Sequence, residues 1–342
     1  MKILFAGGGS LGPVTPLLAT LQAIRRLEPS ASFIWAGTPD GPERELVEAE
    51  AVPFTAIPIA KFPRYPDIRW LTFPFDAFSA SRAARQLIDR EQPDVVVSVG
   101  GFTAVPVIRA ASRIGIPCMI HQLDVTPTWS NRLVESLCSS RTSSFEIPGY
   151  ELLPTPTRFQ FGGVGTHTSS RPIVLIMGGG QGASAINKAV AEKLNRWVLK
   201  ADVIHIAGKG KTDGAEEREG YSVHELLNAD GMKRAYAAAD LVITRAGIGS
   251  LSEIAALKKA AIIVPIPGSH QEANAIAFDT AQAGLYIKQD QEDFADILLQ
   301  QAALLLDDPE RCEKMGETAH VFFATDDGTA FARKIIGATR TA

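Results

Sequence analysis

Two apolar runs that each end in three consecutive glycines constrain the fold of this chain more than any other feature of its sequence. Residues 3–9 read Ile-Leu-Phe-Ala-Gly-Gly-Gly, and residues 173–180 read Ile-Val-Leu-Ile-Met-Gly-Gly-Gly. A helical pattern follows each run, so each is typical of a buried strand that turns through glycines into a helix. Because the pattern opens each half of the 342 residues, it predicts two domains of the same kind.

The rest of the chain alternates short apolar runs with helix-period segments. Continuous runs such as Val95-Val96-Val97 are typical of strands that helices cover on both faces of a parallel sheet. We therefore expect an α/β chain with two Rossmann-like domains that face each other across a cleft. The expected strands are residues 2–6, 33–36, 94–99, 118–121, 173–177, 203–207, 241–244 and 262–264, and the expected helices include residues 17–27, 79–90, 183–198 and 250–257.

Residues 159–171 separate the two halves. They are rich in glycine, serine and threonine and carry few helix or strand signals, which predicts a linker. We expect an amino-terminal domain over residues 1–158 and a carboxyl-terminal domain over residues 172–324. Residues 318–342 are expected to be largely helical.

Charge and cysteine usage exclude several classes of protein. The net charge of −4 provides no basic field for nucleic acid. The three cysteines, Cys118, Cys138 and Cys312, are far apart and odd in number, which favours a reducing cytoplasm and indicates no disulfide framework or metal site. The first apolar run is too short for a signal peptide. The longest uncharged stretch, residues 3–24, is interrupted by glycine, proline and polar residues, so any contact with a membrane is expected to be peripheral.

Four glycine-rich turns, at residues 7–12, 100–103, 178–183 and 245–250, follow expected strands. Glycines let backbone N–H groups approach an anion, and the helix that follows adds partial positive charge. The turns therefore predict phosphate binding, although each could also be a tight turn with no ligand. A nicotinamide dinucleotide is disfavoured, because the second expected strand ends at Thr38 without the acid that would hold a ribose.

Three polar side chains follow the last glycine turn. Glu253 is expected in the first turn of its helix, where it could accept hydrogen bonds from two ribose hydroxyls or simply be favoured by the helix dipole. Gln271 and Asn274 lie within one helical turn of each other, where their amides could bind sugar hydroxyls or cap a helix.

Together these segments resemble the MurG family, the undecaprenyl-pyrophosphoryl-muramoyl-pentapeptide N-acetylglucosaminyltransferases of peptidoglycan synthesis. The resemblance runs in order over about residues 1–290. In the first half it rests on Gly8-Gly9-Ser10 with Pro16, Pro93-Asp94-Val95-Val96 leading to Gly100-Gly101-Phe102, and His121-Gln122. In the second half it rests on Gly178-Gly179-Gly180-Gln181-Gly182-Ala183 with Asn187, Arg245-Ala246-Gly247, Ser252-Glu253-Ile254-Ala255 and His270-Gln271-Glu272-Ala273-Asn274-Ala275.

The resemblance implies a GT-B fold and an inverting glycosyltransferase. The implied reaction moves N-acetylglucosamine from UDP-N-acetylglucosamine to the muramoyl hydroxyl of lipid I, which gives lipid II. The carboxyl-terminal domain would bind UDP-N-acetylglucosamine. The amino-terminal domain, completed by a helix at about residues 325–342, would bind lipid I at the anionic cytoplasmic face of the membrane. No metal or cofactor is expected, because the expected cleft offers no paired carboxylates of the DxD kind, and other cell-wall enzymes are candidate partners.

Residue by residue, the resemblance assigns the donor mainly to the second half of the chain. Glu253 would bind the ribose, the loops of Gly180 and Gly247 would face the diphosphate, and Leu226 and Leu227 would present backbone groups to the uracil. Gln271 and its neighbour His270 would contact the sugar hydroxyls, and Arg158 would lie near the nucleotide. The full set of expected substrate-binding residues is Ser10, Gly12, Gly101, Arg158, Gly180, Gln181, Leu226, Leu227, Gly247, Glu253, His270, Gln271 and Asn274.

The first loop departs from the family pattern, Gly-Gly-Thr-Gly-Gly-His. In residues 8–13 of this chain, Leu11 replaces a glycine and Pro13 replaces the histidine. Proline has no proton acceptor and no backbone N–H, so it cannot assist the deprotonation of an acceptor hydroxyl.

A second departure lies in the family's His-Glu-Gln-Asn segment, which reads His121-Gln122-Leu123-Asp124 here. An amide has become a carboxylate. We hypothesise that Asp124 is the catalytic base and that His121 assists or orients it. Asp124 could instead cap the helix that follows.

These departures leave alternative functions open. One is a weakly active or non-catalytic relative that binds UDP-sugars, and another is a transferase with a different acceptor. A Rossmann oxidoreductase is a third, already weakened by the missing acid.

Residues 62–78 contain six aromatic side chains, with Lys61, Arg64 and Arg69 beside them. Aromatic and basic neighbours suit the headgroup level of an anionic membrane, although such a helix could also pack on its own domain. Because the resemblance implies a hydrophobic patch with basic neighbours in this region, we expect a membrane-facing patch. Its expected members are Arg69, Trp70, Phe73, Phe75 and Phe78.

Overall fold

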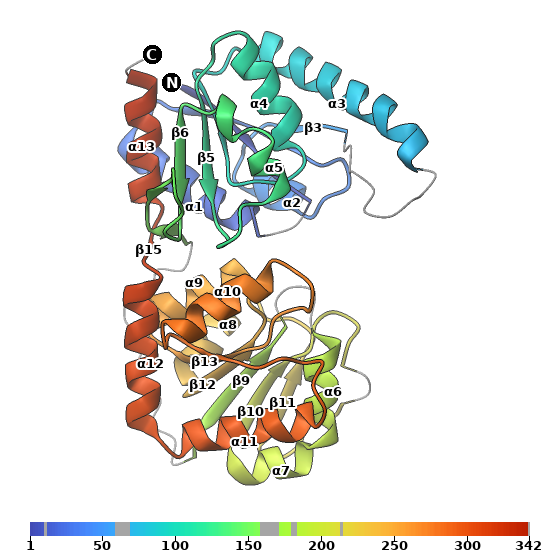
Figure 1. Cartoon of the computed structure of the whole chain (residues 1–342), viewed down its shortest axis with the longest axis vertical. Helices are drawn as coiled ribbons and strands as arrows, with labels where there is room; N and C mark the ends of the chain where they lie inside the picture. Colours follow the sequence, from blue (N-terminus) through green and yellow to red (C-terminus); the bar gives the residue numbers. More distant parts are fainter. Residues whose placement is uncertain (10–11, 59–68, 158–170, 179–182, 213–214, 341–342) are drawn as a thin grey trace. The chain divides into compact units, whose positions relative to one another are not determined.

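The chain divides into two compact units (Figure 1). Unit 1 combines Met1–Arg158 with Asp326–Ala342, and unit 2 is Phe159–Thr325. The computed structural model describes residues 1–9, 12–58, 69–157, 171–178, 183–212 and 215–340, without the side chains of residues 69–72. Each unit contains a parallel sheet packed with helices, so the predicted α/β class is confirmed.

The sheet of unit 1 has the strand order β3-β2-β1-β4-β5-β6-β7, and every pairing is parallel. Its central strands β1 and β4 are adjacent, with Leu4 opposite Val96. The turns that leave these two strands therefore start side by side. The strands are β1 (Lys2–Ala6), β2 (Ser32–Gly37), β3 (Phe54–Ala56), β4 (Val95–Ser98), β5 (Cys118–Gln122), β6 (Ser140–Ser143) and β7 (Glu151–Leu152).

Helices cover both faces of this sheet (Figure 1). On one face, Leu4 and Val96 share a core cluster with Leu87 of α3. On the other, the ring centroid of His121 in β5 lies 5.0 Å from that of Phe331 in α13. The helices are α1 (Val14–Leu27), α2 (Glu43–Ala49), α3 (Arg69–Glu91), α4 (Ala104–Arg113), α5 (Trp129–Arg132), the 3-10 helix η1 (Glu135–Leu137) and α13 (Thr329–Arg340). Just before α13, the short strand β15 (Thr325–Asp326) pairs with β8 (Thr155–Pro156).

The sheet of unit 2 has the order β11-β10-β9-β12-β13-β14, again with parallel pairing throughout. Its core cluster joins Val174 and Ile243 of the strands to Trp197 of α7 and Leu298 of α11. The strands are β9 (Ile173–Met177), β10 (Asp202–Ile206), β11 (Tyr221–His224), β12 (Leu241–Thr244), β13 (Ala260–Ile263) and β14 (Leu285–Tyr286). The helices are α6 (Ser184–Glu192), α7 (Leu194–Lys200), α8 (Ala229–Ala238), α9 (Ile248–Leu257), α10 (Gln271–Thr280), α11 (Phe294–Leu306) and α12 (Pro309–Phe322).

Several predicted boundaries need correction. The single helix expected over residues 183–198 is two helices, because Lys193 leaves the helical conformation at φ −111° and ψ 15° and ends α6. The strand expected at residues 262–264 runs from Ala260 to Ile263. The described part of residues 318–342 is largely helical, as predicted, with β15 between the end of α12 and α13. The missed strands have two to four residues each and form only by pairing with a neighbouring strand; they are β3, β6, β7, β8, β11, β14 and β15.

None of the helices in the described part of the chain combines the length and the apolarity needed to cross a bilayer.

Gly316, within α12, provides a test of the packing of unit 2. A Cβ on Gly316 would lie 1.9 Å from the carbonyl oxygen of Lys258, which caps the end of α9. We expect Gly316→Ala to lower the free energy of unfolding by about 1–3 kcal/mol, because backbone must move to make room. Urea denaturation measures this change.

The matched control is Gly337→Ala in α13, where the added Cβ would meet nothing within 4 Å. That variant is expected to be as stable as the parent or about 0.5–1 kcal/mol more stable, because alanine favours helix. Equal unfolding midpoints for the two variants would contradict the described packing of α12 on α9.

Candidate functional site

The turns that follow β9, β11, β12 and β13 share one edge of the unit 2 sheet, because the carboxyl ends of parallel strands lie together. This edge carries the described members of the expected donor site: Leu226, Leu227, Gly247, Glu253, His270, Gln271 and Asn274. The expected site residues Ser10, Arg158, Gly180 and Gln181 lie outside the described residues, as do most of the expected linker, residues 159–170, and the side chains of Arg69 and Trp70.

Two amide side chains of α10 lie against the glycine turn after β12. Asn274 is fully buried, and its Nδ2 donates to the carbonyl oxygen of Ala246 at 3.1 Å. The side chain of Gln271 lies beside Gly247, because a Cβ added to Gly247 would be 4.0 Å from Gln271 Nε2. The Oε1 of Gln271 accepts from the Ile266 amide at 3.3 Å. These bonds reach neighbouring loops rather than the first turn of α10, so they support the turn and do not cap the helix.

Glu253 lies in the second turn of α9, which corrects its expected place in the first turn, because α9 begins at Ile248 rather than at Ser250. The helix dipole acts mainly within the first turn, so the alternative explanation for this carboxylate loses its basis. Burial raises the pKa of Glu253 to about 7, while a hydrogen bond from the Tyr236 phenol lowers that pKa in part.

The phenol of Tyr236 connects Glu253 to the end of β9. Tyr236 is fully buried in α8, and its hydroxyl donates to Glu253 Oε2 at 2.6 Å. The same hydroxyl lies 3.3 Å from the sulfur of Met177, the last residue of β9 and the neighbour of Gly178. The phenol therefore connects the carboxylate to the side chain of the residue that precedes the glycine turn. Sequence reasoning missed Tyr236, because only the packing of α8 against β9 brings it there.

Arg245 precedes the Gly247 turn, but its guanidinium is already engaged. It is buried, and its Nη1 donates to the carbonyl oxygens of Val264 and Pro265 at 3.0 and 3.2 Å and to Gln289 Oε1 at 2.6 Å. These bonds assign Arg245 to holding the loop after β13.

A second buried network holds the turn after β10. The Nδ2 of Asn187 donates to the carbonyl oxygens of Ala207 and Lys211 at 3.0 and 3.1 Å. Its Oδ1 lies 3.1 Å from Nε2 of His205, whose Nδ1 lies 2.8 Å from the Tyr221 hydroxyl. Burial lowers the pKa of His205 to about 4, so the ring is neutral near pH 7. This network gives Asn187 a structural role.

In unit 1 the glycine turns after β1 and β4 touch. Gly101 has φ +102°, and a Cβ on it would lie 3.1 Å from the carbonyl oxygen of Gly8, so only glycine fits without strain. The Gly101 amide donates to Ser130 Oγ at 3.2 Å, which ties the turn to α5. Gly12 is exposed, just before α1, whose N-cap is Pro13. The structure thus brings Gly101 and the first glycine turn together at the carboxyl edge of this sheet.

Glu43 is a buried carboxylate at this edge that the sequence analysis missed. Its Oε1 accepts from both the amide and the hydroxyl of Thr38 at 2.6 Å, and its Oε2 accepts from the Gly9 amide at 3.2 Å. An acid therefore does lie beyond the end of β2, but protein donors occupy both of its oxygens. It is not available to a ribose, which agrees with the disfavoured dinucleotide.

The expected role of His121 needs correction. Its ring is fully buried, with Nδ1 2.9 Å from Thr142 Oγ1 and Nε2 3.0 Å from Ser144 Oγ, and it packs on Phe331 of α13. Burial lowers the pKa of His121 to about 3. Because both ring nitrogens face protein hydroxyls inside the unit, the ring cannot exchange a proton with a substrate, and it does not assist a base.

Asp124 is half-buried in the loop between β5 and α5. The N-cap of α5 is Thr128, whose side chain accepts from the Asn131 amide, so the alternative in which Asp124 caps that helix is wrong. Gln122 fixes the backbone of this loop by donating to the carbonyl oxygens of Asp124 and Thr126 at 2.9 and 3.2 Å. A glutamate at position 122 could not make these bonds, which explains the amide there.

Two aromatic side chains of the expected membrane patch are prominent on α3. Phe75 is 77% exposed and Phe78 is 70% exposed, whereas Phe73 is half-buried. Arg82 is exposed one helical turn beyond Phe78. The opposite side of α3, through residues such as Ala84 and Leu87, enters the core of unit 1.

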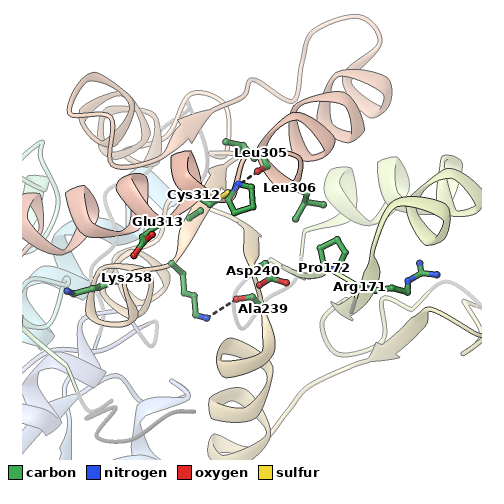
Figure 2. A pocket seen from close by; sticks show the side chains of 12 residues that line it. Arg171, Pro172, Ala239, Asp240, Lys258, Leu305, Leu306, Cys312 and Glu313 are labelled. Carbon is green, nitrogen blue, oxygen red and sulfur yellow. Dashed lines mark hydrogen bonds between the residues drawn. The ribbon is translucent and has the colours of Figure 1, made fainter. Parts of the chain in front are cut away.

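A hollow of about 450 Å³ in unit 2 lies away from the expected site residues (Figure 2). It surrounds the amino-terminal ends of β9, β12 and β13, the edge opposite the glycine turns. Two of its charged groups bind the protein itself: Asp240 accepts from the Ile173 amide at 2.8 Å, and Lys259 donates to the Ala239 carbonyl at 2.8 Å. Within the described residues, no group of three or more His, Cys, Asp or Glu side chains could hold a metal ion.

Comparison with known proteins assigns each unit to a glycosyltransferase domain family. Residues 3–141 match the glycosyltransferase family 28 N-terminal domain, and residues 173–327 match the family 28 C-terminal domain. The crystal structure of Acinetobacter baumannii MurG superposes with a TM-score of 0.79 at 23% identity and covers 98% of this chain and 99% of that one. The glycosyltransferase VinC in complex with dTDP superposes with a TM-score of 0.74 at 13% identity over the whole of both chains. The protein is thus a glycosyltransferase with the GT-B fold.

Curated relatives narrow this class. A UDP-N-acetylglucosamine–N-acetylmuramyl-(pentapeptide) pyrophosphoryl-undecaprenol N-acetylglucosamine transferase from a Nocardioides species is 35% identical over 98% of both chains. A protein of the same name from Lachnoclostridium phytofermentans is 34% identical over 84% of this chain and 86% of its own. The chain belongs to this family of hexosyltransferases, the MurG family, and the resemblance inferred from the sequence is confirmed.

Proposed function

We propose that the protein transfers N-acetylglucosamine from UDP-N-acetylglucosamine to the muramoyl hydroxyl of lipid I, with inversion at the anomeric carbon, to give lipid II. Membership of the MurG family supports this reaction. The observation that carries it is the half-buried carboxylate of Glu253, which accepts a hydrogen bond from Tyr236 at the sheet edge that carries the glycine turns. Such an edge suits a nucleoside diphosphate, because amides can bind the phosphates and an acid can bind the ribose.

On the donor side, Glu253 would accept hydrogen bonds from the ribose hydroxyls. The amides at the start of α9, where Gly247 provides no capping side chain, would bind the diphosphate, as would the loop of Gly180. Gln271 and His270 would contact the sugar, and Leu226 and Leu227 would present their backbone to the uracil. Asn274, through its bond to Ala246, would hold the Gly247 turn in place.

On the acceptor side, the touching turns of Gly8 and Gly101 would bind the diphosphate of lipid I with Ser10 and Gly12. Asp124 would take the proton of the muramoyl hydroxyl while the hydroxyl oxygen attacks the anomeric carbon and UDP departs. The negative charge that develops on UDP would be stabilised by the backbone amides of the donor edge.

The acceptor is attached to a lipid, so the protein must approach a membrane surface. We propose that Phe75 and Phe78 of α3, with Arg82 beside them, enter the headgroup region of the cytoplasmic face of the membrane. The expected members Arg69 and Trp70 precede them on the same helix.

Glu253→Gln tests the donor site, because it keeps the size of the side chain and removes its charge. Calorimetry with UDP-N-acetylglucosamine is expected to show binding weakened about tenfold or more, the usual effect of losing hydrogen bonds to a charged group. Glu310→Gln, on the exposed start of α12, is the control. Equal affinities for the two variants would remove Glu253 from the donor site.

Asp124→Asn tests the base. Turnover of a soluble lipid I analogue is expected to fall about 100-fold or more, since the amide cannot accept the proton, while the affinity for UDP-N-acetylglucosamine stays at the parent value. Asp89→Asn, exposed on α3 in the same unit, should keep full turnover. Parent-level turnover of Asp124→Asn would reject Asp124 as the base.

The membrane patch is tested by co-sedimentation with anionic liposomes. The double variant Phe75→Ser/Phe78→Ser is expected to bind several-fold more weakly than the parent, because it removes apolar surface that would enter the headgroup region. Leu199→Ser/Val321→Ser is the matched control, since these side chains of unit 2 are 81% and 80% exposed. If both double variants lose binding equally, the patch on α3 has no special role.

A further inference from the structure

Tyr236 is a buried titratable group to which the proposed reaction assigns no task. Its side chain is fully buried in α8, and its hydroxyl lies 2.6 Å from Glu253 Oε2 and 3.3 Å from Met177 Sδ. A phenol has one proton to donate, and the short bond to the carboxylate takes it, because charge-assisted hydrogen bonds are the stronger ones. The Met177 sulfur lies beside the same hydroxyl.

We propose that Tyr236 is a positioning residue for the donor: its phenol holds Oε2 of Glu253 so that Oε1 is presented to the ribose hydroxyls of a uridine diphosphate sugar. This inference rests on the proposed function, in which Glu253 binds the ribose. Among the described residues, Tyr236 is the donor to this carboxylate, and it reaches one oxygen only.

The comparison with Glu43 shows why one donor matters. Three protein donors bind the two oxygens of Glu43, and the side chain is fully buried, so a ligand cannot reach that carboxylate. Glu253 has a single described donor, which orients the group and leaves the second oxygen for a ligand. A buried carboxylate with no donor at all would turn freely about its last bond and would favour its neutral form.

Tyr236 also keeps this carboxyl group ionisable. Burial raises the pKa of Glu253 to about 7, and the phenol is the contact that lowers it. Burial and the neighbouring carboxylate raise the pKa of Tyr236 well above its ordinary value, so the phenol remains a donor at every pH of interest.

Other charged groups nearby do not take over this task. Lys233 and Arg234 of α8 are exposed, and the His320 ring of α12 binds the Ala255 carbonyl of α9 at 3.0 Å. In the described part of the chain, no charged side chain contributes to the pKa shift of Glu253.

The consequence is a pH dependence of ribose recognition with a definite sign. Glu253 is protonated below about pH 7, so its bonds to ribose hydroxyls are present above that pH and are lost as the pH falls through it. Removal of the phenol removes a bond that favours the ionised form. The midpoint must then move to higher pH, by about one unit for the loss of one hydrogen bond to a charged group.

The experiment compares UDP with 2′,3′-dideoxy-UDP by calorimetry between pH 6 and 9. The two probes share the diphosphate, whose own protonation falls in this range. The dissociation constant of the dideoxy probe divided by that of UDP therefore isolates the contribution of the ribose hydroxyls. For the parent protein this ratio is expected to fall about tenfold from pH 8 to pH 6, as a group with a pKa of about 7 requires.

Tyr236→Phe should show the same loss with its midpoint about one pH unit higher, and its ratio should approach that of the parent at pH 9. The matched control is Tyr221→Phe. It removes another buried phenol of unit 2, bonded to His205 rather than to Glu253, and should leave the midpoint unchanged. A merely structural role of Tyr236 would lower affinity at every pH without moving the midpoint.

A second measurement keeps the test possible if the Tyr236→Phe protein does not fold. Biosynthetic replacement of tyrosine by 3,5-difluorotyrosine makes the phenol a stronger donor with little change of shape, so the midpoint should move to lower pH. A midpoint that stays at the parent value in either protein overturns the positioning role. If Glu253→Gln instead retains the parent's preference for UDP over the dideoxy probe, the ribose contact itself fails, and with it the proposed donor site.

Discussion

Parallel pairing of the strands is the constraint on which the rest of the structure depends, because it collects the carboxyl end of every strand at one edge of its sheet. In unit 1, β1 lies beside β4, so the turns of Gly8 and Gly101 meet. In unit 2, β9 lies beside β12, with Leu175 opposite Val242, so Gly178, which follows β9, lies at the same sheet edge as the turn of Gly247. Each pair of glycine turns is therefore a consequence of strand order.

Two glutamates show how the same residue type takes opposite roles at these edges. Glu43 accepts from the amides of Gly9 and Thr38 and from the Thr38 hydroxyl, so it ties Gly9 to the end of β2. Glu253 accepts one hydrogen bond, from the Tyr236 phenol, and burial raises its pKa to about 7. Glu43 is fully buried and has three protein donors, whereas Glu253 is half-buried and has one described donor, so the first carboxylate is structural and the second can serve a ligand.

The sequence predicted the central strands and the glycine turns well, because continuous apolar runs and glycine are local signals. The strands 2–6, 173–177 and 241–244 have the predicted bounds. Features that depend on contacts between distant segments could not be read. In the sequence His121 resembles a functional residue, but in the structure Phe331, from the other end of the chain, packs on its ring. Tyr236 and Glu43 carry no motif, and only tertiary packing brings them to the edges.

The make-up of unit 1 from both ends of the chain has a consequence for biosynthesis. Residues from Asp326 onward return to the unit that Met1 begins, and α13 places the fully buried Phe331 against the sheet while it also packs on α1. A ribosome makes α13 after every segment of unit 2, so part of the interior of unit 1 stays uncovered until α13 has been synthesised. Unit 2, which is continuous in the sequence, has all of its segments before unit 1 does. The order of synthesis and the order of completion are therefore reversed.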